Sequence, residues 1–244
     1  MDSNGHSASQ RMPLALDLAW GFGLVGLFCA ATGWLTQPPV LFYFLAAALY
    51  LVVCALIIPF WPEPRDFGWA NRATLLRGSL VIVLVALAPF ADHLTDSLWL
   101  YGWMALLALV LDGVDGKVAR ATDSQSEFGA RFDMELDALF ILGLSLAVLA
   151  LGKAGPWVLA LGLIRYAFVI ATHFLGWLNA PLPESFRRKT VCVWQIVTLL
   201  VAVLPPVNAL FASITLATAL ALLVWSFFLD IHWLYQRRHH HDVH

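Results

Sequence analysis

Hydrophobic residues in this chain form eight long runs, which short polar or proline-containing segments separate. Most of these runs approach the ~20 residues that a helix needs to cross the hydrocarbon core of a bilayer. Prolines mark several of the breaks, at Pro38-Pro39 and Pro62 for example. The pattern predicts membrane-spanning helices at residues 14–36, 40–60, 73–93, 97–121, 129–151, 155–178, 189–211 and 212–235. The last boundary is the least defined, because Pro205-Pro206 lies inside one continuous apolar stretch.

The composition agrees with a membrane protein. Of the 244 residues, 61% are hydrophobic and only 12% are charged, whereas soluble domains carry about a quarter charged residues. The sequence contains no internal repeat and no low-complexity linker. We therefore expect an all-α polytopic membrane protein with about eight transmembrane helices in one helical domain. The formal net charge of −2 does not indicate a partner. For an integral membrane protein of this kind, no nucleic-acid partner is expected.

The basic residues predict the orientation of these helices. If eight spans alternate, twelve of the fourteen lysines and arginines fall on one side: Arg11, Arg65, Arg72, Arg77, Lys117, Arg120, Arg131, Arg187, Arg188, Lys189, Arg237 and Arg238. Lys153 falls on the other side and Arg165 in the middle of a span. Cytoplasmic loops carry the excess of Lys and Arg. Both chain termini and the segment after Arg120 are therefore predicted to be cytoplasmic.

Four aspartates cluster around the segment that joins the fourth and fifth predicted spans. Asp112 and Asp115 are three residues apart, so they share one helix face with about 4.5 Å between them along the axis. Asp133 and Asp137 are four apart and share a face of the next helix. A short return at about 122–128 would bring the two faces together at the cytoplasmic boundary. Carboxylates gathered and partly desolvated there would repel one another strongly.

Divalent cations would relieve this repulsion. Two Mg²⁺ ions carry four positive charges, and oxygen ligands suit such a hard cation, with Mn²⁺ as a substitute. A pair of metal ions about 3.5–4 Å apart suits displacement at phosphorus, because it holds both the attacking and the leaving oxygen. Gly116 and Gly129 flank the acids and would let a ligand approach the backbone. Arg120 is placed to meet a phosphate.

Each of these features has a simpler interpretation when it is taken alone. Two aspartates at a helix end can cap the helix or lie in solvent, and glycines in membrane helices are often packing residues. Lys117 and Glu135 are interpreted as residues at the rim of the site. The combination and its spacing favour the metal site.

That combination is similar to the motif of the CDP-alcohol phosphotransferases. Eight motif positions match: Asp112, Asp115, Gly116, Ala119, Arg120, Gly129, Asp133 and Asp137. The stretch "NRATLLR" at 71–77 resembles the Asn-x-x-Thr-x-x-Arg segment that opens the family's first core helix, and Ser126 stands where many members have Thr or Ser. The family core has six membrane helices. The resemblance therefore implies a core at 73–235, an N-terminal segment with two additional helices at 1–72, and a cytoplasmic tail at 236–244.

The resemblance also implies roles for individual residues. Asp112, Asp115 and Asp133 would bind metal, and Asp137 would contribute to the second ion or act as general base. Residues that would hold the CDP donor are Asn71, Thr74, Asp112, Gly116, Ala119, Arg120, Ser126 and Gly129. The reaction would transfer a phosphatidyl group from CDP-diacylglycerol to a small polar alcohol and release CMP. Such enzymes are commonly homodimers, and the expected location is the cell membrane.

The acceptor alcohol is less defined. Arg165 lies within a predicted span, where an arginine is a candidate functional residue. Arg187, Arg188 and Lys189 begin the seventh span, and together these four residues could bind a phosphorylated acceptor such as glycerol 3-phosphate or an inositol phosphate. Alternatively, the basic run anchors the helix to anionic lipid, and Arg165 pairs with an acid of another span. His239 to His241 form either a metal-binding tract or a solvated tail.

Three other functions compete with this assignment. Within the family, the enzyme could transfer phosphocholine or phosphoethanolamine from its CDP ester to a lipid alcohol. A membrane prenyltransferase also uses aspartates and Mg²⁺, but it would show two separated Asp-rich motifs, and this chain has one cluster. A cation-coupled transporter would carry acids near the middle of several spans. Outside the cluster, the acids Asp17 and Asp230 lie within predicted spans, and both are near span ends.

Overall fold

The structure is a computed structural model that describes residues 14–61, 67–94, 97–121, 126–179 and 185–241, with the side chains at 60, 115–121, 127, 179 and 238–241 excepted. Within these residues it contains helices and no strand. They are α1 (Leu14–Thr36), α2 (Val40–Phe60), α3 (Gly68–Leu87), η1 (Ala88–Leu94), α4 (Leu98–Ala121), α5 (Glu127–Ala150), η2 (Pro156–Leu159), α6 (Ala160–Phe174), η3 (Gly176–Asn179), α7 (Phe186–Val203) and α8 (Ala209–His241). The predicted all-α fold is confirmed.

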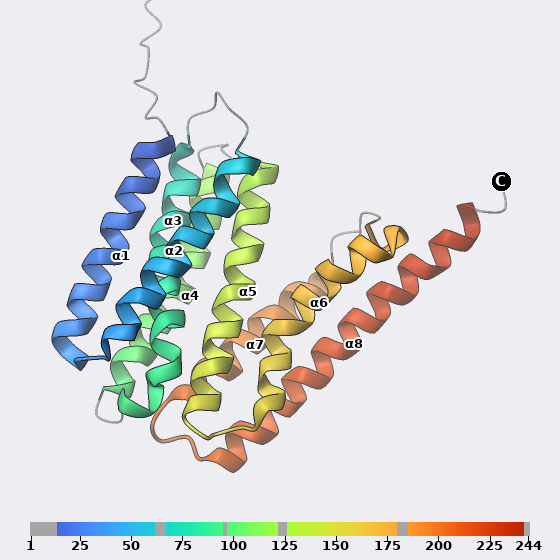
Figure 1. The fold of residues 1–244 in the computed structure, drawn as a ribbon. Helices are drawn as coiled ribbons and strands as arrows, with labels where there is room; N and C mark the ends of the chain where they lie inside the picture. The colour runs from blue at the N-terminus through green and yellow to red at the C-terminus, as the bar shows by residue number, and fades with distance from the viewer. Residues whose placement is uncertain (1–13, 62–66, 95–96, 122–125, 180–184, 242–244) are drawn as a thin grey trace, which may run out of the picture.

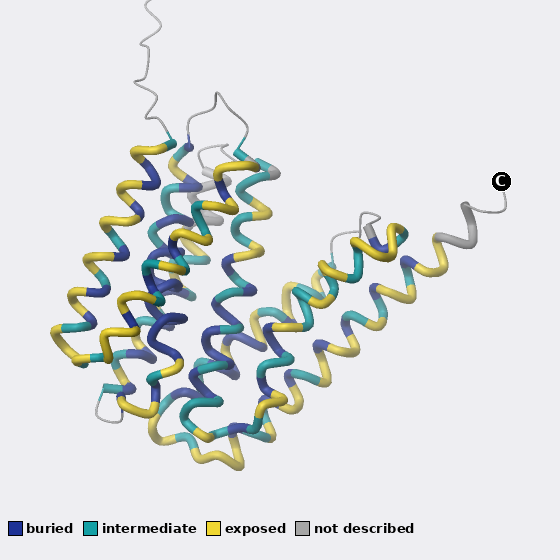
Figure 2. The backbone as a smooth tube through the Cα atoms, viewed as in Figure 1, coloured by how far each residue is buried: buried dark blue, intermediate teal, exposed yellow. Residues whose placement is uncertain are grey.

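Helix α3 is the centre of the molecule. It contacts α1, α2, α4 and α5, which stand side by side with it as one bundle (Figure 1). In the most apolar 18-residue stretch of α3, 78% of the residues are buried, against 28% or less in the corresponding stretches of α1, α2, α6 and α8. This contrast is visible in Figure 2. Helices α6, α7 and α8 lean away from α5 towards the C-terminal end of α8 (Figure 1). Side chains on α3 are therefore held on several sides.

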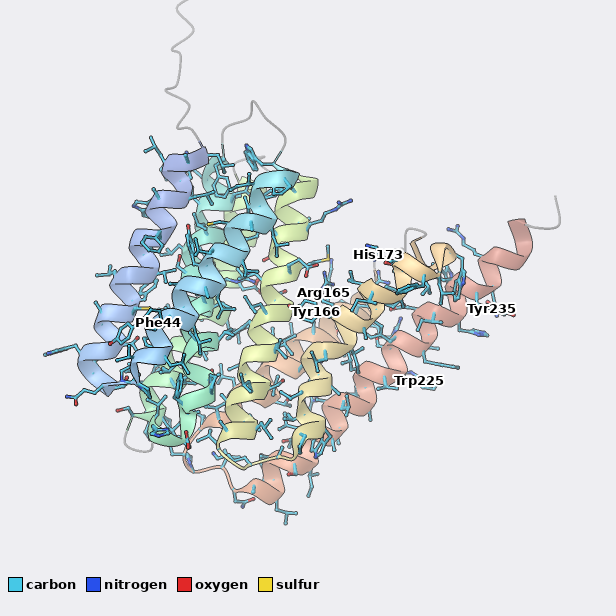
Figure 3. The ribbon with its side chains drawn as sticks, in the orientation of Figure 1. Phe44, Arg165, Tyr166, His173, Trp225 and Tyr235 are labelled. Carbon is cyan, nitrogen blue, oxygen red and sulfur yellow. The ribbon has the colours of Figure 1, made fainter. Side chains whose placement is uncertain are left out.

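The outer surfaces of the helices are apolar. Large hydrophobic side chains such as Trp20, Leu27, Phe44 and Trp225 are more than half exposed, and the last two are labelled in Figure 3. A contiguous apolar exterior of this kind fits a lipid environment. Five helices of the described residues are long and apolar enough to cross a membrane, namely Leu14–Thr36, Val40–Pro59, Gly68–Leu94, Pro156–Phe174 and Ala209–Arg237, and Leu98–Val114 is a shorter apolar helix. The chain is a multi-pass membrane protein.

Several helix boundaries differ from the prediction. The seventh helix ends at Val203 rather than at residue 211, and the eighth begins at Ala209 rather than at 212 and continues to His241. Pro205 and Pro206 explain the break: each lacks a backbone N–H, and Leu204 before them adopts an extended ψ of 141°. The central helix also begins earlier, at Gly68 rather than 73, so residues 68–72 of the predicted N-terminal segment belong to α3.

Buried polar contacts tie α1 to the central helix and α2 to α1. Arg72 on α3 donates to both carboxylate oxygens of the buried Asp17 on α1, at 2.6 and 3.2 Å. Tyr50 on α2 donates to the carbonyl of Leu18 on α1. These contacts place α1 and α2 against the half of α3 that carries Asn71.

Candidate active site

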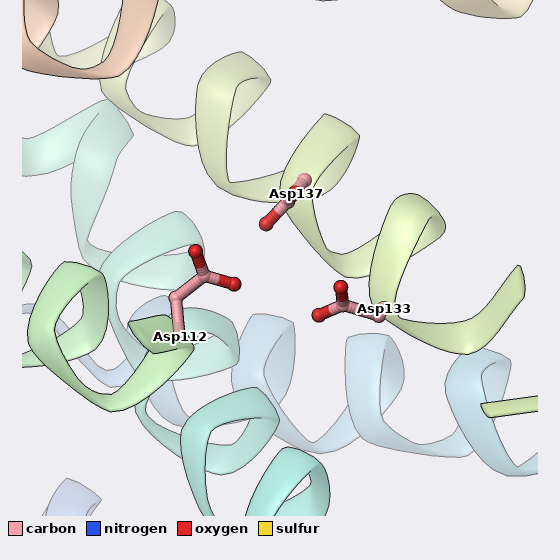
Figure 4. Close-up of side chains that lie close together, drawn as sticks. All are labelled: Asp112, Asp133 and Asp137. Carbon is pink, nitrogen blue, oxygen red and sulfur yellow. The ribbon is translucent and has the colours of Figure 1, made fainter. Parts of the chain in front are cut away.

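Three of the four predicted metal-binding aspartates meet between α4 and α5. Asp112 comes from α4, whereas Asp133 and Asp137 lie one turn apart on α5, and their carboxylates point into a common space (Figure 4). One oxygen atom of each lies within 4.8 Å of the others. Their side chains are 36%, 41% and 24% exposed, so the cluster is open to solution on one side.

An arginine from the central helix completes this cluster. Arg77 on α3 is 1% exposed, and its Nη1 donates to Oδ1 of Asp112 and, at 2.7 Å, to Oδ1 of Asp133. Its Nη2 donates to Oδ1 of Asp137 at 2.6 Å. One guanidinium thus joins α3, α4 and α5. From the sequence, Arg77 was counted as a cytoplasmic charge and as the last residue of the family-like stretch at 71–77, but it was not predicted to belong to the site. Its spacing from Asn71 and Thr74, at i, i+3 and i+6, places all three on one side of the helix.

The donor set fits a divalent cation. Three carboxylates and one guanidinium sum to a charge of −2 in this cluster. Carboxylate oxygens are the ligands that hard cations such as Mg²⁺ prefer. Asp115 belongs to α4, one turn after Asp112. The side chains of Asp115, Gly116, Ala119 and Arg120 lie outside the described residues.

Further predicted donor-binding residues meet at the beginning of α5. Ser126 caps this helix, because its Oγ accepts a hydrogen bond from the Gly129 amide at 2.9 Å. A Cβ atom at Gly129 would lie 2.9 Å from Oδ1 of Asn71 and 3.1 Å from Oγ of Ser126, so only glycine fits without displacement there. Asn71 donates to the Phe67 carbonyl at 2.7 Å, and Thr74 to that of Ala70 at 3.1 Å. A helix N-terminus lined with polar groups favours a negatively charged ligand such as a phosphate.

Arg165 on α6 faces α5. It forms an ion pair of 2.6 Å with Glu135, which lies between Asp133 and Asp137 in the sequence, and Figure 3 shows Arg165 and Tyr166 on the side of α6 next to α5. Of the two alternatives for Arg165, pairing with an acid of another helix is the one observed. Glu135, interpreted above as a rim residue, is its partner.

The basic run at the start of α7 is connected to α8. Arg187 donates to the carbonyl and the hydroxyl of Ser226 at 2.6 and 2.7 Å, and to Oδ1 of Asp230 at 2.6 Å. Arg188 lies 3.5 Å from the same carboxylate oxygen, and Lys189 is exposed. From the sequence, Asp230 was predicted to be an acid within a span, and its partner was not predicted. The backbone of the His239 to His241 tract is helical, but its side chains at 239 to 241 are outside the described residues.

Comparison with known proteins identifies the family. Residues 67–225, from the beginning of α3 into α8, match the CDP-alcohol phosphatidyltransferase family. This chain belongs to that family. The match covers well over half of the chain and leaves α1 and α2 outside it.

Individual relatives differ in the reaction that their names specify. A putative cardiolipin synthase of Mycobacterium tuberculosis is 28% identical over 164 residues, which cover 65% of this chain and 78% of the relative. Human ethanolaminephosphotransferase 1 is 30% identical over 163 residues, covering 60% and 41% of the two chains. A CDP-diacylglycerol–serine O-phosphatidyltransferase of Helicobacter pylori is 33% identical over 106 residues, covering 37% and 44%. No solved structure matches the chain.

Membership of the CDP-alcohol phosphatidyltransferase family establishes the general reaction. The protein is a transferase of substituted phosphate groups in phospholipid biosynthesis, and it moves a phosphatidyl or phosphoalcohol group from a CDP-alcohol to an alcohol. The family depends on divalent metal ions, which agrees with the all-carboxylate cluster. A membrane-embedded site with an opening to solution suits a reaction that joins a lipid to a water-soluble molecule.

Proposed function

We propose that this enzyme transfers the phosphatidyl group of CDP-diacylglycerol to a small polar alcohol and releases CMP. The observation that carries the proposal is the cluster of Asp112, Asp133 and Asp137, which two helices bring to one half-open space. The apolar exterior of the surrounding helices supports a donor with acyl chains. The polar residues at the beginning of α5 support a nucleotide diphosphate beside the carboxylates.

The metal ions in this proposal are two Mg²⁺ ions, for which Mn²⁺ can substitute. Their ligands would be Asp112, Asp115, Asp133 and Asp137. When bound, such ions polarise the phosphoryl oxygens and stabilise the negative charge that develops on the departing CMP. The residual charge of −2 in the described cluster supports one divalent ion, and Asp115 would raise it to −3, part of the charge that a second ion needs.

The remaining roles fall to side chains of this chain. Asp137 is the proposed general base, which takes the proton from the acceptor hydroxyl as that oxygen attacks phosphorus. It is the least exposed of the three acids. The proposed residues that hold the cytidine diphosphate are Asn71, Thr74, Asp112, Gly116, Ala119, Arg120, Ser126 and Gly129. Contacts among Asn71, Ser126 and Gly129 support part of this set.

For the acceptor, we propose a phosphorylated alcohol such as glycerol 3-phosphate or an inositol phosphate, bound by Arg165. Arg165 supports this because it lies on α6 opposite the helix that carries Asp133 and Asp137, and it is a third exposed. An acceptor phosphate would then compete with Glu135 for the guanidinium. Arg187, Arg188 and Lys189 were predicted to share this role, and no observation tests that prediction. Because Arg187 and Arg188 contact Asp230 on α8, our proposal for the acceptor rests on Arg165 alone.

The orientation and assembly are also proposals. We propose that the enzyme lies in the cell membrane with both termini and the active site on the cytoplasmic side. The starts of α3 and α7, which carry Arg72 and Arg187, and the end of α8 lie towards one end of the helices, whereas the connection from α5 to η2, which carries Lys153, lies at the other (Figure 1). We also propose that the chain divides into an additional segment at 1–72, a core at 73–235 and a tail at 236–244. The proposed assembly is a homodimer. Cysteine accessibility in intact and permeabilised cells tests the orientation, and light scattering in detergent tests the dimer.

The proposed reaction is tested by measuring CMP release from purified protein. The protein is incubated with CDP-diacylglycerol and Mg²⁺ in a series of reactions that each contain one acceptor. The acceptors are glycerol 3-phosphate, inositol 1-phosphate, serine and a phospholipid alcohol. We expect CMP and a new phospholipid with a phosphorylated acceptor, and none after EDTA treatment. Equal turnover with serine would exclude a dedicated acceptor-phosphate site, and no turnover with any alcohol would exclude CDP-diacylglycerol as donor.

A second candidate is supported by the similarity to ethanolaminephosphotransferase 1. In this alternative the donor is CDP-ethanolamine or CDP-choline, and the acceptor is a lipid alcohol. The same carboxylates would serve, because the phosphorus chemistry is the same. Incubation with CDP-ethanolamine and diacylglycerol, measured in parallel by CMP release, distinguishes the two candidates.

A further inference from the structure

The guanidinium of Arg77 lies on the protein side of the aspartate cluster. Arg77 is 1% exposed, whereas the three carboxylates that it contacts are 24–41% exposed. The cation is therefore buried beneath the acids, and the acids separate it from the open side of the site. A divalent ion that enters from solution would approach the same carboxylates from the opposite direction.

We propose that Arg77 is a positioning residue that acts as a built-in cation: it holds Asp112, Asp133 and Asp137 together before a divalent ion binds, and it weakens the binding of that ion. This inference rests on the proposed assignment of these carboxylates as metal ligands. It adds a partner on α3, outside the motif that carries the aspartates.

The first half of the inference follows from the contacts. Nη1 of Arg77 bridges an acid on α4 and an acid on α5, and Nη2 binds the second acid on α5. If this guanidinium were absent, the three partly desolvated carboxylates would face one another, and their repulsion would no longer be offset by the charge of Arg77. The planar fork of an arginine suits several carboxylates at once, whereas the ammonium of a lysine is a single point charge.

The second half follows from Coulomb's law. The positive charge of Arg77 repels any cation bound to the same carboxylates, and this repulsion is strong where little water intervenes. Arg77 also orders the ligands, which favours binding, but a buried unit charge facing a doubly charged ion is the larger effect. Removing the charge should therefore tighten metal binding and at the same time make the metal-free protein less stable.

The test compares Arg77→Met with the wild type in two measurements that do not need turnover. Mn²⁺ titration followed by electron paramagnetic resonance gives the dissociation constant, which should fall roughly tenfold or more in the variant. Thermal unfolding in detergent gives the Tm in EDTA and in saturating Mg²⁺. We expect a clear loss of Tm in EDTA and a much smaller loss in Mg²⁺, because a ligand that binds the folded state more tightly stabilises it more.

Two further variants guard against a general folding defect. Arg131→Met removes an exposed arginine of α5, two residues before Asp133, and should leave both the Mn²⁺ affinity and the EDTA-dependent difference in Tm unchanged. Arg77→Met combined with Asp112→Asn removes one positive and one negative charge. In EDTA, this double variant should be more stable than Arg77→Met alone.

The outcomes separate this inference from the proposed function. An equal loss of Tm in EDTA and in Mg²⁺, with unchanged Mn²⁺ affinity, would show that Arg77 only packs between helices and would overturn the inference alone. A double variant no more stable than Arg77→Met would do the same. If neither the wild type nor the variant bound Mn²⁺, the assignment of the carboxylates as metal ligands would fail, and the inference with it.

Discussion

Replacing Arg187 by alanine should destabilise the protein without a specific effect on the acceptor. The substitution removes three hydrogen bonds between α7 and α8, two to Ser226 and one to Asp230, with lengths of 2.6–2.7 Å. It also leaves the carboxylate of Asp230, which is 12% exposed, with Arg188 at 3.5 Å. The change therefore affects how two helices are held together.

The size of this effect can be worked from the contacts. Breaking a buried ion pair by removing one partner costs about 3–5 kcal/mol. The guanidinium here is 31% exposed, and Arg188 can move closer to the carboxylate, so we expect about 2–3 kcal/mol, in the range of one or two charge-assisted hydrogen bonds. For a chain of this size, that corresponds to a Tm lower by roughly 4–12 °C.

Thermal unfolding in detergent measures this loss, and Lys189→Ala is the matched control. Lys189 is exposed in the same turn of α7, so its replacement should change stability by no more than about 0.5 kcal/mol. A double-mutant cycle between Arg187→Ala and Asp230→Ala should give a coupling energy of about 1–2 kcal/mol. Steady-state kinetics on the surviving Arg187 variant should give nearly unchanged KM values for both substrates.

A different kinetic result would refute this reasoning. An unchanged Tm together with an acceptor KM raised tenfold or more would mean that Arg187 binds the acceptor, and that its contacts with α8 contribute little. The predicted acceptor-binding role of the basic run would then be supported.

Three further predictions concern other sites of the molecule. Arg165→Ala should raise the KM for a phosphorylated acceptor roughly ten- to hundredfold, the equivalent of one charge-assisted hydrogen bond, and leave the donor KM within a few-fold. Steady-state kinetics with each substrate varied in turn measure the two KM values, and a similar increase in both would contradict the prediction. Asp133→Asn should abolish turnover while the protein still purifies as a folded species, because this position supplies charge, and near-normal Mg²⁺-dependent activity would argue against the metal role. Asp17→Asn should lower stability by about 2–4 kcal/mol, because it leaves Arg72 without its anionic partner in a mostly buried contact; an unchanged Tm would show that α1 is not held by this pair.

Local sequence patterns were sufficient for much of the fold. Long apolar runs and the breaks between them predicted the helices, since a helix that faces lipid or protein on all sides must be apolar throughout. The error at the last boundary arose where Pro205 and Pro206 interrupt an otherwise apolar stretch. Hydropathy is insensitive to such a break, whereas backbone geometry requires it.

The aspartates of the site were also predictable, because their spacing places them on defined helix faces. Asp133 and Asp137 share a face of any helix that contains both, and Asp112 lies on the preceding helix, close in sequence to the segment that joins the two helices. Ser126 and Gly129 follow the same local logic, as the cap and the first turn of α5. These features depend on residues close together in the chain.

What only the tertiary structure decided is which distant side chains share a partner. Arg77 is separated by 35 residues from Asp112 and by 60 from Asp137, and Arg187 by 43 from Asp230. By sequence alone, both arginines fit the general excess of positive charge on the cytoplasmic side. The packing of α3 between α4 and α5, and of α7 against α8, turns them into buried or half-buried partners of carboxylates. A charge pattern records on which side of the membrane an arginine lies, but its contacts depend on how the helices pack.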